Sequence, residues 1–311
     1  MENCVYIIHE NEEWVTPLKE AFKKLGTSYK DWFINNRQID LQSIPPLGVF
    51  YNRMSASSHT RGHRFAPEIT TSLISWLESH KRLVINGSKA IKLELSKVEQ
   101  YLSLKSFGIK TPKTIVVNSA QLIMDAVKKL NIYPFILKPN RGGKGTGVQL
   151  FSDPESIDTA IKNNSIGESL DGLWLVQEYI KPDDGTITRV EFVGGEFLYA
   201  VKVKTSDDFD LCPADSCQIN DSFCPVGEEG SKFTIADQYS NLDLDKYKRF
   251  FKENDIGIGA LEYSLNSEGE KYVYDVNTNT NYNQKAEIEA GGKKQGMQQI
   301  ARFLTEQFER Q

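Results

Sequence analysis

The sequence has few cysteines and no long apolar run. Only four of its 311 residues are cysteine, at positions 4, 212, 217 and 224. None belongs to a CxxC pair, so neither a disulfide framework nor a zinc site of the usual spacing is expected. No apolar stretch approaches the roughly 20 residues that span a bilayer, and the acidic N-terminus lacks the basic start of a signal peptide. These absences favour a reducing, cytoplasmic location and no membrane partner.

An excess of positive charge is absent as well. The formal net charge is −5, which gives no reason to expect nucleic acid or an anionic membrane surface as a partner. The hydrophobic and charged fractions, 39% and 25%, are those of an ordinary globular protein. A chain of 311 residues is long enough for two or three lobes, each with its own core.

The most informative stretch is residues 135–151, FILKPNRGGKGTGVQLF. An apolar strand carries Lys138 and ends at Pro139, and a second strand follows at 148–151. The loop between them contains Arg141, followed by Gly142, Gly143, Lys144, Gly145 and Gly147. Bare backbone N–H groups can approach phosphate oxygens closely. The spacing is neither that of a P-loop nor of a dinucleotide fold. The stretch therefore predicts a lid over a triphosphate, with a flexible turn as the alternative.

The N-terminal part alternates apolar strands with helices. Strands are expected at 4–9, 29–34, 48–53 and 82–86, and helices at 12–25 and 66–80. This alternation indicates a parallel α/β lobe, in which ligands bind beyond the carboxyl ends of the strands.

A basic loop follows the third of these strands. It contains Arg53, Arg61 and Arg64 together with His59 and His63. Arginine forks suit carboxylate and phosphate groups, so the loop predicts a pocket for an acidic substrate. A solvated surface loop is the alternative, and a metal site at the histidines lacks an acidic partner at useful spacing.

The middle of the chain is read as one long helix followed by mixed elements. The helix runs from Ser88 to Gly108 and carries Lys97. The other elements are expected at 114–117 (strand), 119–130 (helix), from Asp153-Pro154 (helix) and at 173–180 (strand).

Two strands joined at Gly194-Gly195 follow, at 187–193 and 196–204. Their alternation is expected to bury one face and to place Arg189, Glu191, Lys202 and Lys204 together on the other. Residues 205–231 form a cysteine-containing insertion without periodicity. The remaining expectations are a helix over 234–254, strands at 260–265 and 271–277, and a closing helix over 285–309.

The last two strands carry three oxygen-bearing side chains. Glu262 lies on the first strand, and Asp275 and Asn277 alternate on the second, so both face the same side. Two acids and an amide oxygen on one face suit Mg²⁺ held together with substrate phosphates. A polar, solvated sheet face is the alternative.

In this order, the motifs KP…GGKGTG and EY…DVN resemble those of the ATP-grasp enzymes, and most of all the ribosomal-protein glutamate ligases and glutathione-synthetase-like amide ligases. The resemblance covers residues 85 to 305. It implies an α/β protein with α+β lobes: a parallel α/β pre-ATP-grasp domain (1–88), a central and lid subdomain (89–180), and a C-terminal subdomain with the metal site (181–311). It also implies ATP and one or two Mg²⁺ ions as cofactors, with Mn²⁺ as an alternative ion.

The resemblance also implies a role for each matched residue. Glu262, Asp275 and Asn277 would bind the metal, and Arg189, Lys202 and Lys204 would face phosphates or an acyl phosphate. The nucleotide would contact Lys97, Lys138, Gly142, Gly143, Lys144, Gly145, Gly147 and the hinge of Gln177, Glu178, Tyr179 and Ile180. The acidic residue that relatives use for the ribose is replaced by Ile187, which leaves Asp183 or Asp184 for that role. The segment after Asn277, TNTNYN, also departs from the pattern near the acceptor pocket, so a substrate other than the relatives' is expected.

The implied reaction is activation of a carboxylate by ATP and attack of an amine on the resulting acyl phosphate. The product is an amide or peptide bond, and the substrates are amino acids, peptides or peptide-like metabolites. A phosphotransferase or a non-catalytic nucleotide-binding protein on the same fold are the alternatives. Relatives of this kind are often homo-oligomers, but the sequence carries no decisive interface signal.

Overall fold

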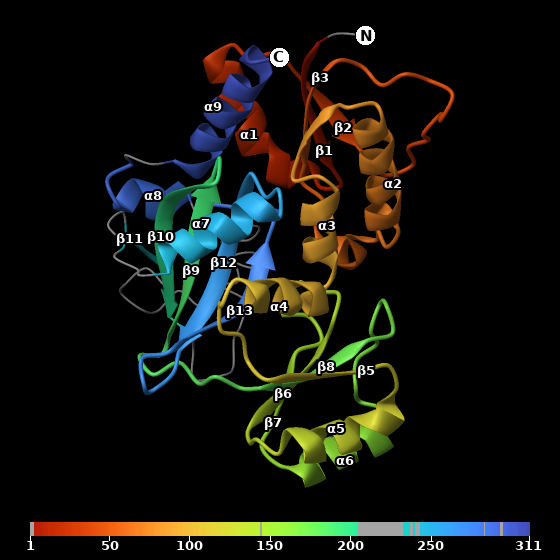
Figure 1. Ribbon diagram of the computed structural model, residues 1–311, viewed down its shortest axis with the longest axis vertical. Helices are drawn as coiled ribbons and strands as arrows, with labels where there is room; N and C mark the ends of the chain where they lie inside the picture. Colours follow the sequence, from red (N-terminus) through yellow and green to blue (C-terminus); the bar gives the residue numbers. More distant parts are fainter. Residues whose placement is uncertain are drawn as a thin grey trace.

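A computed structural model describes residues 3–143, 145–204, 233–236, 239, 243–282, 284–292 and 295–311. The chain is elongated and stacks three sheets along its long axis (Figure 1). The parallel sheet lies at the upper end of Figure 1, the largest antiparallel sheet in the middle, and a smaller antiparallel sheet at the lower end. None of the described helices is long and apolar enough to cross a bilayer.

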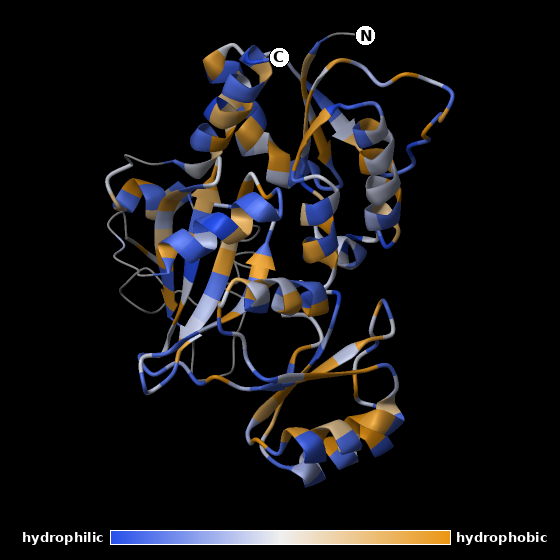
Figure 2. Cartoon of the chain, viewed as in Figure 1, coloured by the Kyte–Doolittle hydropathy of each residue, from blue (hydrophilic) through white to orange (hydrophobic). Residues whose placement is uncertain are grey.

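The upper sheet is parallel, with strand order β2-β1-β3-β4. Its strands are β1 (Cys4–His9), β2 (Tyr29–Phe33), β3 (Gly48–Asn52) and β4 (Leu83–Ile85). Helices α1 (Glu12–Leu25) and α9 (Gly296–Glu309) pack on one face, and α2 (Ala66–Ser79) on the other. Strands β1 and β3 are buried on both faces and are mostly hydrophobic (Figure 2), as is usual for a parallel sheet. The short helix η1 (Ala56–Arg61) follows β3.

The lower sheet is antiparallel, with order β5-β8-β6-β7. Its strands are β5 (Thr114–Val117), β6 (Phe135–Pro139), β7 (Gln149–Phe151) and β8 (Trp174–Glu178). Helices α5 (Ile123–Leu130) and α6 (Pro154–Lys162), with the short η2 (Ala120–Leu122), cover its outer face. The predicted hairpin with a glycine-rich loop is therefore the pair β6 and β7.

The middle sheet is antiparallel, with order β11-β10-β9-β12-β13. Its strands are β9 (Thr186–Val193), β10 (Glu196–Lys204), β11 (Phe233–Ala236), β12 (Ile258–Leu265) and β13 (Lys271–Asn277). Helix α7 (Leu244–Glu253) buries Tyr247, Phe250 and Phe251 against one face, together with α3 (Ser88–Leu95) and α4 (Lys97–Ser106). The opposite face carries charged side chains and turns towards the lower sheet.

The helix predicted over 88–108 is two helices, so that prediction was wrong. The chain is extended at Ser96 (φ −144°, ψ 112°), and the Ser96 Oγ accepts a hydrogen bond from the Glu99 N–H. The Asn140 Oδ1 accepts a second one from the Val98 N–H at 2.9 Å. Ser96 thus ends α3 and caps α4, and Asn140, which follows β6, supports this cap. The apolar periodicity continues across the break, so it did not reveal that α4 runs in a new direction.

Two other predicted helices also differ from the structure. Residues 234–236, expected to begin a helix, belong instead to β11, which pairs with the edge of β10. The β-branched Thr234 and Ile235 favour a strand. The closing helix is split into α8 (Gln284–Glu289) and α9, since Gly291 and Gly292 adopt φ values of +96° and +62°, which a right-handed helix excludes. The insertion expected over 205–231 lies outside the described residues.

Candidate active site

A cavity lies where the lower sheet faces the charged side of the middle sheet, next to the end of β3. It is lined by residues from all three parts of the chain: Ser55, Ser57, Glu94, Lys97, Gln100, Lys138, Pro139, Gly142, Gly143, Gly145, Thr146, Val148, Arg189, Glu262, Tyr274, Asp275, Val276, Asn277 and Asn279. Nine of the side chains and glycines expected from the sequence are therefore brought to one place, from segments that are up to 180 residues apart.

Lys97 enters the cavity from the first turn of α4. Its Nζ lies 2.6 Å from the Asp275 Oδ1 on β13. The backbone of Lys97 is fixed as well, because its N–H donates to the Asn140 carbonyl at 3.3 Å. Asn140 directly follows the strand that carries Lys138. Its contact with Lys97 therefore fixes the position of Lys97 relative to Lys138.

Lys138 is almost fully buried on β6, with 5% of its surface exposed. Its Nζ donates to the Tyr101 hydroxyl at 2.7 Å, and that hydroxyl donates to the Tyr274 carbonyl at 2.9 Å. Burial, reinforced by the neighbouring Lys97 charge, lowers the pKa of Lys138 to about 7. Near neutral pH the charged and neutral forms of Lys138 are therefore close in free energy, and a bound anion would favour the charged form.

The glycine-rich loop rests on the N-terminal part of the chain. A Cβ at Gly143 would lie 3.0 Å from the Ser57 Cβ, so the loop touches η1 with little room for a side chain. Arg141 donates to the Glu68 carboxylate on α2 at 2.7 Å. Gly147 has φ +76°, in the region that glycine favours. Lys144, expected to contact phosphate, lies outside the described residues.

Glu262, Asp275 and Asn277 face the cavity together, because Glu262 is opposite Asp275 and Ala260 is opposite Asn277 across β12 and β13. The Asn277 Nδ2 lies 3.0 Å from the Glu262 Oε1. The same oxygen accepts from the Arg189 Nη1 at 3.0 Å. Two carboxylates and an amide on one buried face form a donor set that fits a hard divalent cation.

The expectation that Lys202 and Lys204 share a face with Arg189 was wrong. In the register of β9 and β10, Arg189 is opposite Val201, whereas Lys202 and Lys204 are opposite Thr188 and Thr186. Side chains of directly opposed residues point to the same side of a sheet, so the two lysines point away from the cavity. The register shifts by one residue at an irregularity between Phe197 and Tyr199. Such a bulge changes which residues are opposed beyond it, and the alternating pattern of the sequence did not reveal it.

The proposed adenine hinge lies at the end of β8, outside the cavity lining. The Gln177 Nε2 donates to the Thr114 Oγ1 at 2.8 Å, and the Glu178 carboxylate accepts from the Lys113 N–H at 3.1 Å. Tyr179 and Ile180 follow the strand and are partly exposed. Asp184 accepts from the Thr186 N–H at 3.0 Å and pairs with Lys202 at 3.5 Å.

The three arginines of the basic loop line no part of the cavity. Arg53 is 2% exposed, and it donates to the Trp14 and Thr280 carbonyls and to the Asn279 and Asn281 side chains. Its guanidinium therefore fastens the segment after β13 to the parallel sheet. The Arg61 guanidinium is paired with the buried Glu10 carboxylate and lies over the Trp14 ring. Arg64 is exposed, with its guanidinium 5.8 Å from the Phe65 ring centroid.

Several cavity residues were missed from the sequence, among them Glu94, Gln100, Tyr274 and Asn279. Gln100 lies one turn after Lys97 and exchanges hydrogen bonds with the Val276 backbone, at 2.9 and 3.1 Å. Asn279 lies two residues after Asn277, at the spacing that continues the cavity-facing pattern of Asp275 and Asn277. Glu94 carries no sequence signal, because the Ala56 and Thr278 donors that hold its carboxylate lie 38 and 184 residues away.

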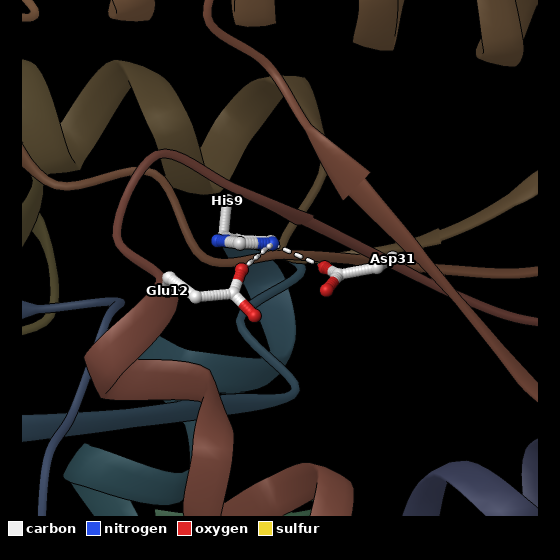
Figure 3. A group of neighbouring side chains, drawn as sticks. All are labelled: His9, Glu12 and Asp31. Atoms are coloured by element: carbon white, nitrogen blue, oxygen red, sulfur yellow. Dashed lines mark hydrogen bonds and ion pairs between the residues drawn. The ribbon is translucent and has the colours of Figure 1, made fainter.

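A second group of titratable side chains lies on the parallel sheet, away from the cavity. The His9 Nε2 contacts the Asp31 carboxylate and lies 3.9 Å from the Glu12 Oε2 (Figure 3). Lys19 pairs with both carboxylates. Lys19 thus offsets one of the two negative charges, and burial lowers the pKa of His9. The four side chains form one ion-pair cluster at the edge of the parallel sheet.

Known proteins share both the sequence and the fold. The RimK-like ATP-grasp domain family matches residues 86–290. Probable alpha-L-glutamate ligase 2 of Pseudoalteromonas atlantica is 33% identical over 191 residues, 60% of this chain and 62% of that protein. Probable alpha-L-glutamate ligase of Teredinibacter turnerae is 31% identical over 166 residues, 52% of this chain and 50% of that protein. The matched part thus spans between half and two thirds of these relatives.

A solved structure of the ATP-grasp ligase PsnB, complexed with minimal precursor, superposes with a TM-score of 0.68. The two chains are 14% identical, and the match covers 98% of this chain and 100% of that one. The likeness shows that the fold extends over the N-terminal lobe as well as the matched domain. With the family match over most of the chain, it establishes that this chain is a member of the RimK-like ATP-grasp family.

Proposed function

We propose that this protein is an ATP- and Mg²⁺-dependent carboxylate–amine ligase that forms an amide or peptide bond and releases ADP and phosphate. The observation that carries the proposal is the cavity itself. Two lysines and a glycine-rich loop face a pair of carboxylates and an amide across a narrow space. Cations and bare N–H groups suit phosphates, and the oxygen cluster suits the metal that accompanies them.

Each part of the cavity has a task in this chemistry. Glu262, Asp275 and Asn277 would hold Mg²⁺, which when bound neutralises the phosphate charge that develops during transfer. Lys97 and Lys138 would contact the transferred and leaving phosphates. The loop over 141–147 would exclude water, which matters because an acyl phosphate hydrolyses readily.

Arg189 is placed to stabilise the second step. A carboxylate oxygen attacks the γ-phosphorus, the bond to ADP breaks, and an acyl phosphate forms. The amine nitrogen then attacks the acyl carbon, and the tetrahedral oxyanion needs a nearby donor. Arg189 lies between Glu191 and Glu262 at 2.6 and 3.0 Å, so its guanidinium is held at the cavity wall without reorganisation.

The names of the relatives and of PsnB support the substrate class. The relatives are named as glutamate ligases and PsnB is complexed with a precursor, so amino acids and peptides are the first compounds to test. The sequence after Asn277 differs from the family pattern, and Arg53 fixes it by hydrogen bonds to the Thr280 carbonyl and Asn281. We therefore include peptide-like carboxylates beyond L-glutamate.

The test is ADP release from Mg-ATP with pools of amino acids and short peptides, with hydroxylamine as a substitute nucleophile. Hydroxamate that depends on one carboxylate supports the ligase and identifies the activated acid. A stable phosphorylated product without hydroxamate would instead indicate a phosphotransferase. Tight ATP binding without turnover in broad pools would indicate a binding protein.

A further inference from the structure

Glu94 is a cavity acid that the proposed metal site does not use. It lies at the end of α3, and its carboxylate is held from two sides. The Oε1 accepts from the Ala56 N–H at 3.1 Å. The Oε2 accepts from the Thr278 N–H at 2.9 Å and from the Thr278 Oγ1 at 3.0 Å. Its position between η1 and the end of β13 is thus fixed.

The charges of the cavity leave Glu94 in a distinct position. Of the described residues that line the cavity, three are acidic: Glu94, Glu262 and Asp275. Glu262 is paired with Arg189 and Asp275 with Lys97. Within the described parts of the chain, no lysine, arginine or histidine nitrogen forms an ion pair with Glu94.

The Glu94 side chain is partly buried, and this burial affects its charge. Only part of the Glu94 side chain is accessible, and it borders the cavity. Burial raises the pKa of the Glu94 carboxyl to about 7 even though three donors favour its charged form. A cation that entered the cavity at this point would therefore meet a carboxylate that has acceptor capacity left beyond its three hydrogen bonds and no competing cation among the described residues.

We propose that Glu94 binds the ammonium group of the acceptor amine and holds it beside the activated carbonyl. This inference rests on the proposed ligase function and names the residue that recognises its second substrate. Ser55 and Ser57, on either side of Ala56, also line the cavity, with their hydroxyls hydrogen-bonded to each other at 2.9 Å.

The step balances without a further reagent. The ammonium loses one proton to water, its nitrogen lone pair forms the C–N bond, and the C–O bond to phosphate breaks. The departing phosphate keeps the electron pair of that bond and takes the second proton from nitrogen. Glu94 contributes by concentrating and orienting the amine, which can supply a large part of the rate.

The competing explanation is that Glu94 has a purely structural role and joins these segments. The same hydrogen bonds join α3 to η1 and to the segment after β13, so loss of Glu94 could simply loosen the cavity. The two explanations differ for a nucleophile that is uncharged near neutral pH. Hydroxylamine is such a nucleophile, and it needs no carboxylate to bind it, whereas an amino acid presents an ammonium group.

The experiment compares Glu94→Gln with wild type, using the carboxylate that gives hydroxamate and a mixture of common amino acids as the amine source. We expect amide formation to fall about 30-fold or more at subsaturating amine while hydroxamate formation stays within about 3-fold. A parallel loss of both activities overturns the proposal. If the wild-type enzyme gives no hydroxamate with any carboxylate, the proposed function fails, and this inference fails with it.

Two further variants separate charge from stability. Thr278→Val removes one hydrogen bond to Glu94 and keeps its charge, so its ratio of amide to hydroxamate should match wild type. If the ratio in Thr278→Val shifts as it does in Glu94→Gln, the structural role of Glu94 explains both results and the proposal is wrong. Should Glu94→Gln not fold, Glu94→Asp retracts the carboxylate, and we expect the KM for the amine to rise about 10-fold with hydroxamate formation unchanged. Glu78→Gln is the control, since Glu78 accepts the Ser88 N–H outside this cavity.

Discussion

Arg189 and Glu262 are directly opposed on β9 and β12, and the Arg189 Nη1 lies 3.0 Å from the Glu262 Oε1. Lys202, which lies opposite Thr188 on β10, points to the other face of the same sheet. The buried Arg189 therefore faces the cavity, whereas the exposed Lys202, which the sequence analysis grouped with it, does not.

This separation predicts unequal effects of two matched substitutions. Arg189→Met should lower kcat/KM by about 100-fold or more, because the charge facing the reacting groups is lost and Glu262 loses its partner. Lys202→Met should change it by less than about 3-fold. Steady-state ADP release checks both. Equal losses in the two variants would contradict the assignment of the cavity face.

Asp275 is expected to matter for turnover more than for nucleotide affinity. Asp275→Asn removes a proposed metal ligand and also frees Lys97 from its ion pair. We expect kcat to fall about 100-fold or more while the Kd for ATP stays within about 10-fold, since the freed lysine still attracts phosphate. Asp255→Asn, at an exposed surface ion pair, is the control. Turnover like that of wild type in Asp275→Asn would refute the metal assignment.

Arg53 should contribute to stability more than its charge alone suggests. Its guanidinium joins Trp14, Thr280 and Asn281 in the interior. Arg53→Met should lower the free energy of unfolding by about 3 kcal/mol or more, because buried acceptors lose their donors. The exposed Arg64→Met should change it by about 0.5 kcal/mol or less. Urea denaturation of both variants measures the difference, and similar values would show that Arg53 is not a structural clamp.

Lys138 gives a pH-dependent prediction. Its pKa is about 7 in the folded protein and 10.5 ordinarily, so the unfolded chain binds more protons between these values and stability rises with pH across that window. Below pH 7 the full cost of burying the charge is present. Lys138→Met should therefore stabilise the protein at pH 6, by about 1 kcal/mol or more, and progressively less towards pH 10.

Thermal unfolding at several pH values, without nucleotide, tests this dependence. Lys105→Met, on the exposed side of α4, is the matched control and should show no trend with pH. A gain for Lys138→Met that is constant from pH 6 to 10 would contradict the pKa shift. The same substitution should abolish turnover, because the lysine faces the proposed phosphates.

The sequence predicts the elements of this protein better than their mutual placement. Alternation identified β9 and β10, and the glycine-rich stretch after Lys138 marked a loop that borders the cavity. The irregularity between Phe197 and Tyr199 was not predicted, so Lys202 and Lys204 were assigned to the wrong face. Arg53 looked like a ligand contact because a sequence cannot show that its donors are already used. The break between α3 and α4 was missed because the cap at Ser96 depends on Asn140, a residue more than forty positions away.

The link between Asn140 and the start of α4 bears on protein engineering. The Asn140 side-chain oxygen accepts from the Val98 N–H, and the backbone carbonyl of Asn140 accepts from the Lys97 N–H. A displacement of Asn140 would therefore uncouple the first turn of α4, so a movement of the glycine-rich loop that leaves Lys97 in place has to begin beyond residue 140. Chimaeras that exchange glycine-rich loops between relatives should be joined after Asn140, which leaves the spacing of the two lysines to the recipient scaffold.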